Sequence, residues 1–343
     1  MRLNLKYLLR ISAAIVCGVF FCTETYAAGP AGKGVVVAYT TSWTDDMPDP
    51  ENFDCLNYAF ARINDTYDGV EIDNVERFRQ IIDMCRARNG KQVLLSVGGW
   101  GRGGFSEMAA DAKKRRAFAW NCRKLIWDMG FDGIDIDWEY PTQSNAGIAA
   151  SEDDINNFTL LLKELRTAIG PKRVISVAVI STGMYFDFRE SDQYVDYYNV
   201  MCYDMGQPPF HNAPLYKSNL VQNISISDAT GQLVAAGAPK GKIVIGIPFY
   251  GRGNEDFPED TKSSDARLKG GYFYNWDEDA KAPYLTDKAG KLCYSYDDTV
   301  SIRYKCEFIR QMNLKGAMCW PTSGDDENGT LLKSVREHLS VSR

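Results

Sequence analysis

Residues 131–141 read FDGIDIDWEYP, and this stretch decides the expected fold and chemistry of the chain. Successive side chains of a β-strand point to opposite faces of the sheet. Asp135, Asp137 and Glu139 therefore share one face, while the residues between them are apolar. An apolar second face indicates that other parts of the protein cover the strand. The sequence predicts a buried strand that carries a row of three acids.

The three acids lie too close together to be ionised at the same time. Alternate residues of a strand are about 6.5 to 7 Å apart, and at an effective dielectric constant of about 20 two unit charges at that distance repel by about 2.4 kcal/mol. This repulsion keeps at least one carboxyl protonated near neutral pH, which suits general acid catalysis. The alternatives are a solvated strand face and an oxygen-lined Ca²⁺ site. The apolar opposite face and the lack of EF-hand glycine spacing disfavour both.

The composition is that of an ordinary globular protein, with 343 residues of which 45% are hydrophobic and 24% are charged. The formal net charge of −6 indicates no basic surface for nucleic acid or acidic lipid. His211 and His338 are the only histidines, and no C-x-x-C or H-x-x-x-H spacing occurs. We therefore expect no transition-metal site built by the protein.

The N-terminus has the pattern of a signal peptide. Cationic residues are followed by an apolar run over residues 11–22 and then by small residues that end at Ala28. The apolar run is short for a membrane span. We expect residues 1–27 to be a leader and residues 28–343 to be one secreted or periplasmic catalytic domain with no membrane span. A lipid anchor on Cys22 is the alternative, and the bulky residues before Cys22 disfavour it.

Nine cysteines include two in the leader, and the seven that remain are an odd number. Cys55, Cys202 and Cys319 lie within apolar runs. We therefore expect most of the cysteines to be small buried apolar residues. A single bridge between Cys293 and Cys306 is the alternative.

Apolar runs typical of strands recur about every forty residues, with helix-like segments between them. There are eight such runs, at residues 35–40, 53–60, 92–97, 131–138, 174–180, 197–203, 243–249 and 316–320. Alternating strands and helices in this number favour an α/β fold, the (β/α)₈ TIM barrel, with catalytic groups at the C-terminal strand ends. An open doubly wound sheet is disfavoured, because no G-x-G-x-x-G segment follows the first run.

The spacing between the seventh and eighth runs is too long for one helix. The excess, residues 254–296, is rich in tyrosine and includes the segment GYFYNWDED. We expect a small α+β insertion here, with a long surface loop as the alternative. Aromatic residues at this density favour a packed structure.

The segment DGIDIDWEY at residues 132–140 resembles the signature of glycoside hydrolase family 18, the chitinase family. Five further segments extend the resemblance along most of the chain: LLSVGGW (94–100), MCYDM (201–205), HNAPLY (211–216), GIPFYGRG (246–253) and GAMCWPTSGDD (316–326). One of these segments alone is a weak signal. Their joint occurrence in this order is specific.

The resemblance implies a secreted chitinase-type hydrolase that cleaves β-1,4 N-acetylglucosaminyl linkages without an enzyme nucleophile. Its substrate would be chitin or chitooligosaccharides. By match to the motif, Glu139 is the general acid and base, Asp137 orients the substrate's acetamido group, and Asp135 shares a proton with Asp137. Tyr203 would donate to the acetamido oxygen, with Asp204 as its acidic neighbour. We expect a monomer that needs no cofactor.

The resemblance also implies the residues that surround the substrate. Trp320 would form the floor of the sugar subsite, and the hydroxyls of Tyr39 and Ser96 would hold Asp135. The remaining expected contacts are Phe60, Gly98, Gly99, Trp100 and Met201. Asp132 has the opposite strand parity to the catalytic row, so we expect it to be structural.

Two other functions are alternatives for a chain with this resemblance. An endo-β-N-acetylglucosaminidase acting on N-glycans would lack the Tyr-Asp pair, the tryptophan of the last strand and the insertion. A chitinase-like lectin binds sugar without cutting it, and loss of the catalytic acid is its usual mark. Glu139 is present in this chain, which favours an active hydrolase.

Overall fold

The computed structural model describes residues 33–88, 90–258 and 261–340. The predicted leader over residues 1–27 and the anchor considered at Cys22 lie outside these residues. Within the described residues, no helix is both long and apolar enough to cross a membrane.

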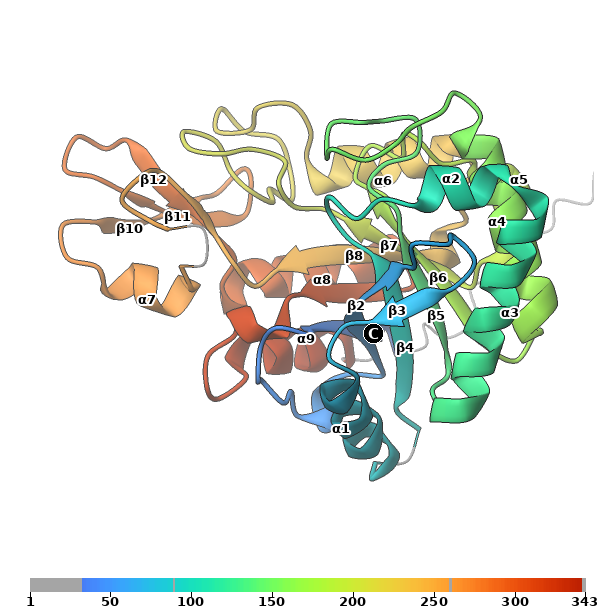
Figure 1. Ribbon diagram of the computed structural model, residues 1–343. Coiled ribbons are helices and arrows are strands. Elements are labelled where there is room, and N and C mark those ends of the chain that lie inside the picture. The colour runs from blue at the N-terminus through green and yellow to red at the C-terminus, as the bar shows by residue number, and fades with distance from the viewer. Residues whose placement is uncertain (1–32, 89, 259–260, 341–343) are drawn as a thin grey trace, which may run out of the picture. The chain divides into compact units, whose positions relative to one another are not determined.

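A closed barrel of parallel strands forms the centre of the described chain (Figure 1). Its strands follow the order β1-β13-β8-β7-β6-β5-β4-β2, and a direct pairing of β1 with β2 closes the ring. The barrel strands are β1 (Val35–Thr41), β2 (Cys55–Ile63), β4 (Gln92–Gly98), β5 (Gly133–Asp137), β6 (Val174–Ile180), β7 (Tyr197–Met201), β8 (Ile243–Pro248) and β13 (Gly316–Trp320). The short strand β3 (Val70–Ile72) adds to β2 in the antiparallel sense.

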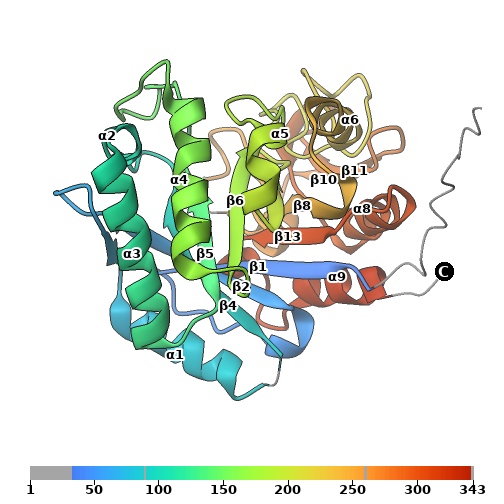
Figure 2. The same ribbon diagram turned by 90° about the vertical axis from the view of Figure 1, so that its right-hand side faces the viewer.

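Helices surround the barrel, as Figure 2 shows for α3, α4 and α5. These helices are α1 (Val75–Arg86), α2 (Phe105–Ala110), α3 (Ala112–Met129), α4 (Asp154–Ile169), α5 (Phe188–Ser191), α6 (Ile226–Ala236), α8 (Thr299–Gln311) and α9 (Thr330–Ser340). Except for β1 and β2, which a short 3-10 helix (Pro50–Asn52) joins, successive barrel strands are joined by α-helices. This order and the closed parallel ring confirm the predicted (β/α)₈ barrel. Strands of such a barrel are covered on both faces, so their sequences are continuous apolar runs.

The acidic strand is β5, and all five of its residues are buried. It is shorter than predicted at both ends, because Phe131 lies before it and Trp138 after it. Ile134, Ile136 and Trp138 pack in the apolar layer between the barrel and its helices. The alternation predicted from the sequence is therefore the alternation between the barrel interior and the helix layer.

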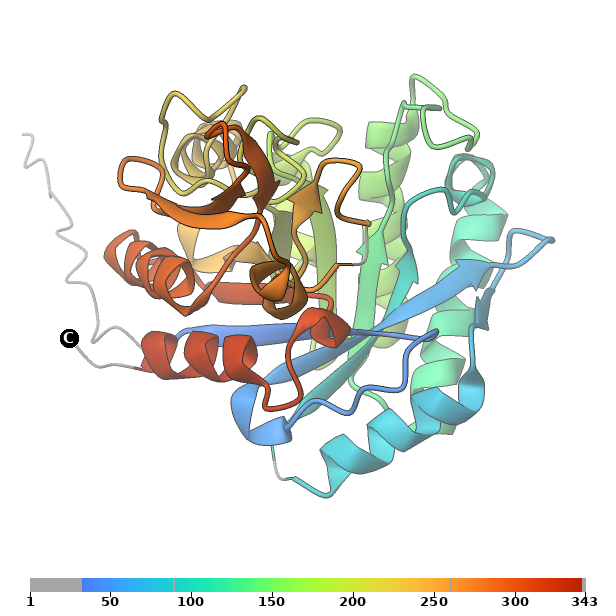
Figure 3. The same cartoon turned by 90° about the vertical axis from the view of Figure 1, so that its left-hand side faces the viewer.

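The predicted α+β insertion lies between β8 and β13, and Figure 3 shows it at the upper left beside the barrel. It contains helix α7 (Ser263–Leu268) and a four-stranded antiparallel sheet in the order β10-β11-β12-β9. These strands are β9 (Arg252–Gly253), β10 (Phe273–Asp277), β11 (Ala282–Thr286) and β12 (Leu292–Ser295). The small sheet packs on a core of its own that includes Phe257, Leu285 and Tyr294.

The seven cysteines of the described residues are all buried and free. The bridge considered between Cys293 and Cys306 is therefore not formed. Burial raises the pKa of the Cys85 thiol to about 12, which keeps it protonated at neutral pH. The cysteines act as small apolar residues in the packing.

Candidate active site

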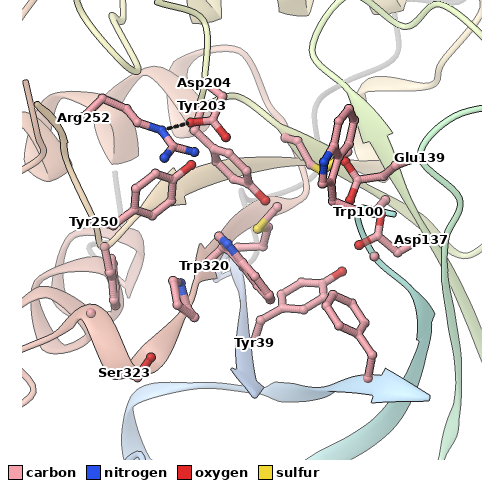
Figure 4. Close-up of a pocket in the computed structure, with 18 of the residues that line it drawn as sticks. Tyr39, Trp100, Asp137, Glu139, Tyr203, Asp204, Tyr250, Arg252, Trp320 and Ser323 are labelled. Atoms are coloured by element: carbon pink, nitrogen blue, oxygen red, sulfur yellow. Dashed lines mark hydrogen bonds and ion pairs between the residues drawn. The ribbon is translucent and has the colours of Figure 1, made fainter. Parts of the chain in front are cut away.

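A cavity of about 970 Å³ opens at the C-terminal ends of the barrel strands, the end at which TIM-barrel enzymes place their sites (Figure 4). Ten of the residues proposed from the sequence line it: Tyr39, Phe60, Gly99, Trp100, Asp137, Glu139, Met201, Tyr203, Asp204 and Trp320. Three others, Ser96, Gly98 and Asp135, lie outside the lining. They support the residues that reach the cavity.

Asp135 is fully buried in the barrel, where four side chains donate to its carboxylate. Tyr39 Oη and Ser96 Oγ donate to one oxygen over 2.8 and 2.7 Å. Ser176 Oγ and Asn199 Nδ2 donate to the other over 2.6 and 3.2 Å. Burial raises the pKa of Asp135, and these hydrogen bonds act in the opposite direction. Asp135 is thus held rigidly by donors from the strands around it.

Asp137 follows on the same face of β5 and reaches the cavity. Its side chain is buried, and Oδ1 has no hydrogen-bond partner among the described residues. Burial raises the pKa of Asp137 well above its usual range, and the charges of Glu139 and Asp135 raise it further. A buried oxygen without a partner is costly in free energy, so this atom is ready to interact with a bound molecule.

Glu139 lies two residues beyond the end of β5, beside the cavity. Burial raises the pKa of Glu139 to about 7, opposed by a hydrogen bond with the Tyr140 side chain and assisted by the charge of Asp204. A carboxyl with a pKa of about 7 can both donate and accept a proton at neutral pH. This property matches the proton-holding row predicted from the sequence.

Gly98 and Gly99 allow the end of β4 to approach its neighbours closely. Gly98 has a φ of 120°, and a Cβ atom there would lie 2.0 Å from the carbonyl oxygen of Asp137. A Cβ atom on Gly99 would lie 2.7 Å from the Phe60 ring. The Gly99 N–H also donates to the Asp137 carbonyl over 2.9 Å. The glycine pair therefore fixes the backbone of Asp137 and directs Trp100 toward the cavity.

The opposite wall contains Tyr203 and Asp204, which lie two and three residues beyond the end of β7. Asp204 has a φ of 55°, and its carboxylate accepts from Arg252 Nε over 2.6 Å (Figure 4). The Tyr250 ring packs edge-on to that of Tyr203 at 6.0 Å, and the Arg252 guanidinium lies 4.9 Å from the Tyr250 ring. Tyr250 and Arg252 were not among the residues predicted from the sequence. The segment GIPFYGRG contains both residues and the end of β8, the seventh barrel strand along the chain. This motif could have indicated them as residues of the site.

Aromatic rings form the floor of the cavity. The Trp320 ring lies 5.8 Å from that of Tyr39 and 5.7 Å from that of Phe60. Trp43 was also missed, although it lies just beyond the end of β1, where an exposed aromatic residue is a signal of binding. Its ring is 6.5 Å from Trp320 and 61% exposed. An apolar floor with polar walls suits a ring-shaped polar ligand such as a sugar.

Ser176 and Asn199 are two further residues of the site that were not predicted from the sequence. Ser176 pairs in register with Asp135, and Asn199 has the same strand parity as Met201 and Tyr203. Parity could therefore have suggested both of them as interior side chains. The described residues contain no group of three His, Cys, Asp or Glu side chains that could hold a metal ion.

The family model for glycosyl hydrolases family 18 matches residues 35–325 of the chain. The chain belongs to glycosyl hydrolase family 18. Among its family 18 relatives, Chitinase A1 of Niallia circulans is 31% identical over 324 residues, which cover 80% of this chain and 46% of the relative. Chitotriosidase-1 of Mus musculus is 27% identical, with 91% of this chain and 79% of the relative covered. The chain spans about half the length of three bacterial relatives, Chitinase A1 of Niallia circulans, Chitinase 63 of Streptomyces plicatus and Chitinase C of Streptomyces lividans.

Solved structures of family 18 proteins share the fold. An N-acetylglucosaminidase of this family from Paenibacillus barengoltzii superimposes with a TM-score of 0.81 at 31% identity, covering 89% of this chain and 99% of the other. A Group IV chitinase from Ostrinia furnacalis superimposes with a TM-score of 0.80 at 28% identity, covering 90% of this chain and all of the other (100%). These likenesses support a glycoside hydrolase on a barrel of this type.

Proposed function

We propose that this protein is a secreted chitinase-type hydrolase that cleaves β-1,4 N-acetylglucosaminyl linkages with retention of configuration. The observation that carries the proposal is the buried oxygen without a partner on Asp137, a residue that lines the same cavity as Glu139 and the aromatic floor. An acceptor in this position suits the N–H of a 2-acetamido group. The names of the relatives, which are chitinases and a chitotriosidase, agree with such a substrate.

In the first step, Glu139 donates its proton to the glycosidic oxygen while the bond from that oxygen to the anomeric carbon breaks. The carbonyl oxygen of the substrate's own acetamido group forms a bond to the anomeric carbon and gives an oxazolinium ion. Asp137 accepts from the acetamido N–H and stabilises the developing positive charge. Tyr203 donates its O–H to the acetamido carbonyl oxygen and holds it in line for attack.

In the second step, the deprotonated Glu139 takes a proton from water as that water attacks the anomeric carbon and opens the oxazolinium ring. The carboxyl returns to its starting state. A pKa of about 7 lets Glu139 serve in both steps near neutral pH. Asp135, held by four donors, supports the carboxyl of Asp137 from below and shares its proton as the charge on Glu139 changes.

The aromatic floor of the cavity favours a polymer of N-acetylglucosamine as the substrate. The Trp320 ring offers a flat apolar surface to the sugar bound beside Glu139, and Trp43 and Trp100 extend the aromatic lining. Several sugar rings can therefore contact the cavity along one chain. Export through the leader at residues 1–27 and a monomeric state remain part of the proposal.

Product analysis tests the proposal and its two alternatives. The protein is incubated with chitotetraose, with chitohexaose and with a high-mannose glycoprotein, and the products are separated by mass. Shorter chitooligosaccharides with an intact glycoprotein are the expected result. Release of the N-glycan would favour the endo-β-N-acetylglucosaminidase, and tight binding of the oligomers without cleavage would favour the lectin.

A further inference from the structure

A chain of hydrogen bonds runs from the small sheet of the insertion to the backbone of Asp204. It begins at Asp277, the last residue of β10, whose Oδ2 accepts from Ser218 Oγ over 2.6 Å and lies 3.1 Å from His211 Nε2. The other carboxylate oxygen accepts the backbone N–H groups of Asp279 and Ala280, each over 3.0 Å. Asp277 is thereby fixed on the insertion while it holds the histidine ring.

His211 joins the insertion to the segment that follows β7. Its side chain is fully buried, and Nδ1 lies 3.3 Å from Ser295 Oγ at the end of β12. The Tyr284 ring covers the imidazole edge-on at 5.4 Å. Both ring nitrogens therefore bind side chains of the small sheet, one on β10 and one on β12. The ring cannot turn without losing both contacts.

Asn212 carries the connection to the catalytic wall. Its backbone N–H donates to Ser295 Oγ over 3.0 Å, and its side-chain Oδ1 accepts the backbone N–H of Asp204 over 2.8 Å. Its carbonyl oxygen accepts the N–H of Met205 over 3.0 Å. Asp204 has a φ of 55°, a conformation that a non-glycine residue adopts at some cost. The two hydrogen bonds from residues 204 and 205 to Asn212 hold the backbone in that conformation.

We propose that His211 is a positioning residue of the hydrolase, which acts through Ser295 and Asn212 to fix Asp204 and the neighbouring Tyr203 against the substrate. This inference rests on the proposed function, and it assigns the insertion a second task beside forming a wall of the cavity. The motif HNAPLY, found at residues 211–216, thereby gains a physical role.

The contacts of this chain end on Asp204, a residue that lines the cavity, and this favours a role in positioning over a role in packing alone. Asp204 is held at two points, by Asn212 at its backbone N–H and by Arg252 at its carboxylate. Arg252 lies on β9, which pairs with β12, so the same small sheet supplies one contact directly and supports the other through Ser295, which accepts from Asn212. Figure 4 shows Arg252 and Glu139 on opposite sides of Asp204. Loss of the backbone contact leaves Asp204 held through its carboxylate, which Arg252 binds on the side away from Glu139.

The test compares His211→Phe and Ser295→Ala with a matched control, Thr286→Val. Thr286 is buried in the same sheet, and its hydroxyl accepts from Asn275 Nδ2 over 2.9 Å within that sheet. The control therefore removes a hydroxyl from the insertion without touching the chain of contacts to Asp204. Four quantities are measured for each protein: kcat and KM on an aryl chitobioside, the melting temperature, and the Glu139 pKa by ¹³C NMR of its carboxyl carbon.

Both test variants should lower kcat by about 10-fold to 100-fold, the range expected when a group near the reaction is misplaced by a fraction of an ångström to one ångström. KM should change less than kcat. The Glu139 pKa should fall, because the negative charge of Asp204 moves away while Asp137 and Tyr140 stay in place. The control should keep the wild-type kcat and the wild-type Glu139 pKa.

A lower melting temperature with unchanged kcat and an unchanged Glu139 pKa would overturn the inference and leave His211 a packing residue. Ser295→Ala decides the question if His211→Phe fails to fold, because it removes only one oxygen atom. The NMR titration requires no turnover. If the wild-type protein cleaves no chitooligosaccharide, the proposed function fails, and the titration still shows whether these contacts position Asp204 relative to Glu139.

Discussion

Asp137 and Asp135 share one face of β5 but have opposite surroundings. Four side chains donate to the carboxylate of Asp135, while Oδ1 of Asp137 is buried without a partner among the described residues. The first acid is held in place by the protein, and the second is left to interact with a ligand. This difference is the physical basis for the roles that we propose for the two residues.

Glu139→Gln should keep the fold and sugar binding, because the amide has nearly the same shape as the protonated carboxyl. It should lower kcat by at least about 10²-fold, the lower range for general acid catalysis. The measurement is turnover of an aryl chitobioside beside a binding titration with a chitooligosaccharide. A variant with near wild-type turnover would show that another group donates the proton.

The rate should depend on pH through Glu139, because its carboxyl is mostly ionised above its pKa of about 7. Only the protonated carboxyl can donate, so kcat/KM should fall as pH rises through about 7. The charge of Asp204 contributes to the raised pKa. Asp204→Asn removes this charge, so the alkaline limb should move to lower pH. A limb that stays in place, or moves to higher pH, would contradict the electrostatic link between the two residues.

Trp320→Ala should weaken turnover more than it weakens folding. The indole faces the cavity and should support the distorted sugar, so we expect a loss of about 2 to 4 kcal/mol in kcat/KM, above an ordinary stacking contact because the ring also positions the acetamido group. Steady-state kinetics with soluble oligomers and a thermal melt measure the two effects. Unchanged kinetics with a much lower melting temperature would make Trp320 a residue of the core.

The substrate-assisted mechanism requires an N-acetyl group on the sugar at the non-reducing side of the cut. Fully deacetylated chitosan oligomers should therefore not be cleaved, and thiazoline mimics of the oxazolinium ion should inhibit. Proton NMR of the first products should show the β-anomer. Tyr203→Phe should slow the reaction, because the acetamido oxygen loses a positioned donor. Initial release of the α-anomer would exclude the proposed roles of Asp137 and Tyr203.

Strand parity accounts for the parts of the structure that the sequence predicted well. The row Asp135, Asp137 and Glu139 needs only the alternation of one strand, and the apolar residues between its members identified the buried face. The order of eight apolar runs was sufficient for the barrel, because parallel strands joined by helices have few other closed arrangements.

The residues that were missed depend on relations between distant segments. Ser176 and Asn199 reach Asp135 from neighbouring strands, and a single sequence does not contain the register of those strands. Arg252 and Asp204 meet because they lie beyond the ends of β8 and β7, two strands that pair in the barrel. His211 was noted for its motif and as one of two histidines, yet its contacts with Asp277 and Ser295 join segments more than sixty residues apart.

The free cysteines have a practical consequence for the folding of this barrel. Because the seven cysteines of the described residues form no bridge, the domain needs neither an oxidant nor a disulfide isomerase to reach its native state. The domain should therefore assemble equally well in the reducing cytosol of a production host and in an oxidising compartment. Its buried thiols should also resist alkylation until the chain unfolds, so reaction with a thiol reagent would report directly on unfolding.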